Sequence, residues 1–144
     1  MGDDFVIDCF VDSNGRANIG LSYNIGQTNE VIDSKDMLLE QKAQFENGFL
    51  KCQFKLKPIF GFRGRQFDLM NKRYHIFIAH GELENNKGSK FHHDLKTRSS
   101  EPVNLALVGN LESKDMTYLI RVHGKHQNIK LSTLIILTLQ GLLW

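Results

Sequence analysis

The chain has too few cysteines to be a disulfide scaffold, and its charges nearly balance. Two cysteines occur in 144 residues, an even number that could form one pair. Eighteen basic and 16 acidic residues leave a formal net charge of +2, too small to imply a nucleic-acid partner. The chain as given has no signal peptide, because MGDD lacks basic and apolar regions, and Val6 stands where N-myristoylation requires Ser or Thr. The composition is that of an ordinary globular domain.

Helical apolar stripes of useful length are also missing, and period-two alternation takes their place. Residues 4–11 alternate in this way, and the DSNG segment that follows is typical of a tight turn. The clearest signal runs over residues 43–57, where Asn47-Gly48 predicts a hairpin turn. Beyond that turn, one face carries Leu50, Cys52, Phe54 and Leu56, and the other carries Lys51, Gln53 and Lys55.

Other segments complete an all-β pattern. Strands are expected at residues 16–23, 73–82 and 101–109, with a loop over 24–36 and a turn over 84–90. The 73–82 strand is apolar on both faces, which predicts burial on both sides. Because the turn signals recur at the spacing found in sandwiches, the sequence predicts an antiparallel β-sandwich.

The carboxyl-terminal residues 131–144 carry no charge. Fourteen residues fall short of the roughly 20 needed to span a bilayer as a helix. Two readings stay open for this apolar tail. It is a terminal core strand or a poorly ordered end, or it is a truncated membrane segment or the tail of a lipid-anchored precursor.

The histidines and the stretch KPIFGFRGRQF offer weak candidate sites. His80, Glu82, His92 and His93 could in principle bind zinc, but their spacing fits no tight ligand pattern. The absence of a Gly-x-Ser-x-Gly motif argues against a serine hydrolase. KPIFGFRGRQF mixes arginine with phenylalanine, as in sites that stack single-stranded nucleic acid. On a chain of balanced charge we expect instead a solvated loop pinned by core phenylalanines.

Four motifs stand in a fixed order along the first three quarters of the chain: MGDDFVIDCFVDSNGRANIGLSYNIGQ, FENGFLKCQFK, YHIFIAHGE and HHD. In this order they resemble the DOMON domain of ferric-chelate reductases and ferric-chelate-reductase-like proteins. The resemblance implies an immunoglobulin-like DOMON sandwich whose carboxyl-terminal portion is residues 1–108, followed by a linker over 109–130 and the apolar tail. In the relatives several strands precede this methionine, so the first strands are expected to be missing, as in a fragment or an incomplete gene model.

The resemblance also implies a cofactor. Haem-binding DOMON domains hold a b-type haem between a Met thioether and a His imidazole, and the matching positions are Met1 and His93, with His92 as the fallback ligand. Two axial ligands leave no open position for oxygen, and a Met ligand raises the reduction potential, so such a centre relays single electrons. The alternative is that His93-Asp94 is only a surface turn.

The cysteines fit the same family. Cys9 and Cys52 both fall on the apolar sides of their strands, so each is either a small buried hydrophobe or half of a bridge. In an extracellular relative of this family, a Cys9–Cys52 disulfide is expected.

The resemblance finally implies a setting. The domain is expected to be membrane-associated, on the extracellular or lumenal side, and to exchange electrons with a cytochrome b561-type membrane domain or with a ferric chelate. Ferric-chelate reductase activity would then belong to the larger assembly, and no nucleic-acid partner is expected. The alternative is a haem-free DOMON interaction module that assists a membrane receptor complex.

Overall fold

The computed structural model describes residues 4–26, 28–33, 35–83, 90–105, 116–123 and 134–141. Within these ranges every secondary-structure element is a strand, and no helix long and apolar enough to cross a membrane occurs. The strands are β1 (Asp4–Val11), β2 (Ala17–Ile25), β3 (Thr28–Ile32), β4 (Leu38–Glu46), β5 (Phe49–Leu56), β6 (Ile59–Phe62), β7 (Arg65–Asp68), β8 (Arg73–Leu83), β9 (Lys90–Arg98), β10 (Val103–Asn104), β11 (Met116–His123) and β12 (Leu134–Gly141).

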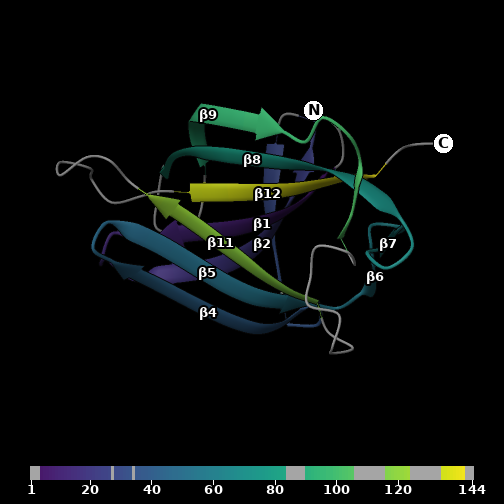
Figure 1. Ribbon diagram of the computed structural model, residues 1–144, viewed down its shortest axis with the longest axis horizontal. Helices are drawn as coiled ribbons and strands as arrows, with labels where there is room; N and C mark the ends of the chain where they lie inside the picture. Colours follow the sequence, from purple (N-terminus) through teal and green to yellow (C-terminus); the bar gives the residue numbers. More distant parts are fainter. Residues whose placement is uncertain are drawn as a thin grey trace.

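Two antiparallel sheets form the layers of a sandwich (Figure 1). The larger sheet has the order β10-β8-β12-β1-β2-β3, and β9 pairs with the same edge of β8 as β10. The smaller sheet has the order β11-β5-β4. A separate two-stranded hairpin, β6–β7, lies at one end of the molecule (Figure 1). The predicted antiparallel β-sandwich is confirmed.

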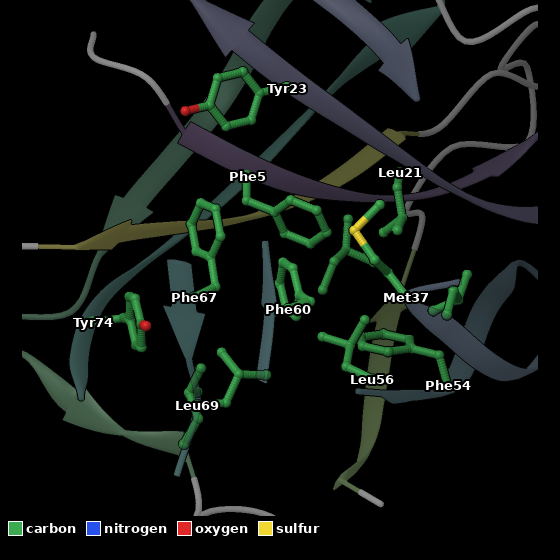
Figure 2. Close-up of a cluster of buried hydrophobic side chains, with 13 residues drawn as sticks. Phe5, Leu21, Tyr23, Met37, Phe54, Leu56, Phe60, Phe67, Leu69 and Tyr74 are labelled. Carbon is green, nitrogen blue, oxygen red and sulfur yellow. The ribbon is translucent and has the colours of Figure 1, made fainter. Parts of the chain in front are cut away.

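The core lies between the two sheets because the strands alternate apolar and polar residues. In β1 the inward side chains of Phe5, Ile7, Cys9 and Val11 are fully buried. Facing them, β5 buries the four apolar side chains that follow the Asn47-Gly48 turn, as predicted. The hairpin adds Phe60 and Phe67, whose rings stack with their centres 5.1 Å apart and both pack against the ring of Phe5 (Figure 2).

Two predicted loops contain strands. Within the expected loop 24–36, β3 pairs with β2, and its side chains are nearly all exposed. A strand whose side chains face solvent shows no apolar alternation, so patterning misses it. The expected loop around residues 58–67 is the β6–β7 hairpin, although its phenylalanines are in the core as expected.

The carboxyl-terminal third contains two further strands. Within the expected linker 109–130, residues 116–123 form β11 and pair with β5, which the linker prediction did not contain. Within the apolar tail, residues 134–141 form β12, a strand between β1 and β8, in agreement with the reading of the tail as a terminal strand. An uncharged segment suits that place, because a central strand is flanked by protein on both edges. The predicted strand 101–109 is shortened to β10 within the described residues, and most of the turn predicted at 84–90 lies outside them.

The prediction for β8 holds only in part. Tyr74 and Ala79, on opposite faces of this strand, are both buried, but Ile78 is 42% exposed. The strand is therefore not covered along its whole length on both sides.

Candidate functional site

Met1 and the side chain of His93, the predicted haem ligands, lie outside the described residues, so the pair stays a prediction. In the sequence, Met1 is three positions before β1. The backbone of His93 lies opposite Gly81 of β8. Gly81 pairs with Leu134, and Leu134 pairs with Phe10, so His93 shares a row with the carboxyl end of β1. The start of β1 at Asp4 is six residues from that row, about 20 Å at the usual rise per residue.

The row of His93 adjoins an apolar cluster on the outer face of the large sheet. Val6 and Ala79 are buried there, and the partly buried Phe10 packs against them. A flat apolar cofactor needs a surface of this kind beside its ligand. The side chains of His92 and His93 lie outside the described residues, so their contacts stay a prediction.

A polar network lies on the same outer face. Asp8 is 5% exposed and Ser22 is fully buried, and the Ser22 hydroxyl donates to Asp8 Oδ2 at 2.6 Å. The Asn29 amide donates to Ser22 Oγ at 3.1 Å and to Asn24 Oδ1 at 2.8 Å. A carboxylate is tolerated in such a place because hydrogen bonds replace its hydration.

The four residues of the zinc candidate have no described side chains, so this site stays a prediction. They are His80, Glu82, His92 and His93. Among the residues whose side chains are described, no group of three or more His, Cys, Asp or Glu could hold a metal ion.

The two cysteines form a disulfide between the sheets. Cys9 of β1 and Cys52 of β5 are bonded, with their Cα atoms 6.2 Å apart, inside the range that a disulfide accepts. Both are fully buried, together with Val11 and Leu50. The pairing implied by the family resemblance is therefore present, and it fixes one sheet to the other.

An open groove runs along the β6–β7 hairpin, with a volume of about 710 Å³. Its lining is a mixture of cationic, aromatic and apolar side chains, most of them from the stretch KPIFGFRGRQF. Three cations reach it from the hairpin and from the residue after β5, and one carboxylate reaches it from the turn before β4. These are Arg63, Arg65, Lys57 and Asp36.

The two arginines of the groove are held in place. The Arg63 guanidinium lies 5.9 Å from the centre of the Phe62 ring and pairs with Glu30 of β3. The Arg65 guanidinium lies 5.8 Å from the Phe67 ring centre and donates to the Tyr23 hydroxyl at 3.5 Å. Cation–π contacts of this kind orient a guanidinium without neutralising its charge.

Tyr74 attaches the hairpin to β8. Its hydroxyl accepts a hydrogen bond from the Asp68 backbone N–H at 2.8 Å and donates to the Asp68 carbonyl at 3.2 Å. Burial raises the pKa of the Tyr74 phenol above its usual value, so the neutral form that can donate is retained. Hydrogen bonds from the Asn71 side chain lower the pKa of the Asp68 carboxyl.

The phenylalanines of KPIFGFRGRQF are not exposed as nucleic-acid stacking would require. Phe60 and Phe67 are buried in the core, so neither ring can stack on a base. Phe62 is half-buried and packs on Tyr23, with ring centres 5.0 Å apart. A single partly accessible ring is less than single-strand binding surfaces normally offer.

The sequence signal that could have found the groove is the dipeptide Arg63-Gly64. An x-Gly pair between two short apolar runs predicts a two-residue hairpin turn. The turn would then have placed Arg63 at its tip and Arg65 just after it. The contributions of Lys57 and Asp36 depend on packing between elements, which local patterning does not contain.

No protein-family model matches the chain, and no solved structure matches it. A curated protein of Drosophila melanogaster, named "Putative ferric-chelate reductase 1 homolog", is 32% identical to it over 130 residues. The match covers 86% of this chain and 19% of that protein, so the chain spans about a fifth of its relative's length. The β-sandwich described above is thus similar in sequence to one segment of a ferric-chelate-reductase-like protein.

Proposed function

We propose that the chain is a DOMON-type sandwich of a ferric-chelate-reductase-like protein, and that it relays single electrons through a b-type haem held by Met1 and His93. The observation that carries this proposal is the similarity to the Drosophila relative over 86% of the chain, together with the β-sandwich fold. The reductase activity belongs to the larger assembly, in which a cytochrome b561-type membrane domain and a ferric chelate are the proposed electron-transfer partners.

The residues of this chain suit such a group in their chemistry. A thioether and an imidazole are a known pair of axial haem ligands, and when bound the group supplies one-electron transfer at a raised potential. The apolar cluster of Val6, Phe10 and Ala79 adjoins the row of His93 and could exclude water from one side of the site. The buried Asp8–Ser22 pair keeps the neighbouring face hydrogen-bonded.

The disulfide supports the proposed location. A buried bridge between the two sheets forms and persists in oxidising compartments and is rare in the cytosol. As part of the same proposal, this domain lies on the extracellular or lumenal side of a membrane.

The second candidate function is a haem-free interaction module in a membrane protein or receptor complex. The register of the large sheet favours it, because the start of β1 and the row of His93 are about 20 Å apart.

A haem titration of the purified chain separates the two functions. The electron relay predicts sharp low-spin bands in the dithionite-reduced spectrum, and His93→Ala should abolish the six-coordinate form. His92→Ala tests the fallback ligand and should leave the spectrum unchanged if His93 is the ligand. If the spectrum survives in both variants, the ligand assignment is wrong. If a folded wild-type chain shows no bands, the haem-free module is the better account.

A further inference from the structure

A backbone conformation at the tip of the β6–β7 hairpin is unusual for its residue. Arg63 has φ of 49° and Gly64 has φ of 73°, so both turn positions are left-handed. The β4–β5 hairpin has the same turn, with Asn47 at 51° and Gly48 at 76°. Asn and Gly suit these positions, whereas a long side chain such as Arg is disfavoured there. The chain thus has an arginine at a turn position that asparagine would occupy with less strain.

The side chain of Arg63 lines the groove. Lys57, Arg63 and Arg65 line it together with the amide of Gln66. The carboxylates of Asp36 and Glu30 offset part of this charge, and the Glu30 pair uses only some of the five N–H donors of Arg63. Because both guanidinium groups already rest on phenyl rings, little side-chain freedom remains to be lost when an anion binds.

The size and chemistry of the groove define what it could hold. A volume of about 710 Å³ is within the usual range for small-molecule sites. Guanidinium groups bind carboxylate and phosphate oxygens through paired hydrogen bonds, and Lys57 adds a point charge. The half-buried Phe62 and the exposed Ile59 supply an apolar wall for the carbon skeleton of a ligand.

We propose that this groove binds a small, multiply charged oxyanion, an organic polycarboxylate or phosphate compound, through Arg63, Arg65 and Lys57. The proposal is independent of haem, because none of these residues belongs to the proposed ligand set. The strain at Arg63 is then the cost of holding a guanidinium at the rim of an anion site.

The test is isothermal titration of the purified chain with citrate and, in a second arm, with inorganic pyrophosphate, at constant ionic strength. Arg63→Asn removes the cation and restores the residue that the equivalent turn uses at Asn47, so the hairpin should fold. We expect affinity for at least one anion to fall about tenfold, the value of a charged hydrogen bond. Lys57→Gln, a change outside the turn, should also weaken binding.

Arg16→Gln is the matched control, because it removes one exposed positive charge at the turn between β1 and β2. Its affinity should stay within about twofold of the wild type, as expected for screened charge at a distance. Citrate binding alone would identify a polycarboxylate, and pyrophosphate binding alone a phosphate compound. The proposal is overturned if the wild type binds neither anion at millimolar concentration, or if Arg16→Gln weakens binding as much as Arg63→Asn. It is also overturned if Arg63 instead supports binding of a single-stranded oligonucleotide.

Discussion

The two ends of the sandwich are held by different chemistry. At the carboxyl end of β1, the Cys9–Cys52 disulfide joins the two sheets among small aliphatic side chains. At its amino end, Phe5 packs on Phe60 and Phe67 of the hairpin, with ring centres 4.8 and 5.5 Å apart (Figure 2). At the disulfide end the bridge itself links the two sheets, whereas at the aromatic end the hairpin supplies two of the three packed rings.

This difference explains why positively charged side chains cluster at the hairpin end of the sandwich. Phe60 and Phe67 anchor the hairpin in the core. The side chains of Arg63 and Arg65 line the groove instead, so their charge does not disturb core packing. The disulfide end has no comparable element among the described residues, and its buried cluster consists of Cys9, Val11, Leu50 and Cys52. The aromatic end is therefore the part of the described chain that combines rigidity with an accessible groove.

The largest expected effect is at the aromatic end. Phe67→Ala should destabilise the fold by about 3–5 kcal/mol, because it removes a ring that is 2% exposed and touches two others. Phe49→Ala, at a site 47% exposed, should change stability by under about 1 kcal/mol. Urea denaturation followed by circular dichroism measures both. Equal losses would mean that the hairpin does not hold this end.

The disulfide end should come second. Replacing both Cys9 and Cys52 by Ala should cost about 2–4 kcal/mol, because the bridge constrains a separation of 43 residues in the unfolded chain. The wild type in dithiothreitol should unfold at nearly the same urea concentration as the double variant. A reduced protein as stable as the oxidised one would show that packing alone holds this end.

Exchanging the two turn residues should give a smaller, paired effect. Arg63→Asn should stabilise the chain by about 0.5 kcal/mol, since relief of left-handed strain is offset by loss of the Glu30 pair. Asn47→Arg should destabilise it by about 1 kcal/mol at a turn of the same geometry. Thermal unfolding of both variants checks the signs. Changes of the same sign would remove the strain argument.

The smallest effect concerns pH. Hydrogen bonds from Asn71 lower the pKa of Asp68 in the folded state, so their contribution is present above the usual value of 3.8 and is lost as pH falls through the lower folded value. The group is exposed to solvent, so the loss should stay below about 0.5 kcal/mol. Asn71→Ala should reduce the difference in stability between pH 6 and pH 3. An unchanged difference would contradict the assignment.

Patterning predicted what depends on local alternation. The strands at residues 4–11, 43–57 and 73–82 follow from period-two patterning, and the turn between β4 and β5 follows from Asn47-Gly48. β5 shows the simple pattern of one buried and one more exposed face, whereas β1 is buried on both faces.

β3 was missed because its exposed side chains show no alternation of apolar and polar residues. β11 was missed, and β12 was left as one of two readings, because the places of both strands depend on pairing with distant strands. The turn sets the register of a hairpin. No local signal of this kind sets the place of a strand that pairs with a partner far away in the sequence.

The candidate sites divide in the same way. The Cys9–Cys52 pairing followed from a family resemblance and is present, while the groove needed the folded hairpin to bring Lys57, Arg63 and Arg65 together. The Met1–His93 pair stays a prediction, because Met1 and the His93 side chain lie outside the described residues.

The central claim, electron relay, is tested most directly by the reduced-minus-oxidised optical spectrum of the haem-titrated wild-type chain. The account predicts sharp low-spin bands that develop at one haem per chain in the reduced state. A spectrum without such bands, from a chain that circular dichroism shows to be folded and that retains its disulfide, would contradict it.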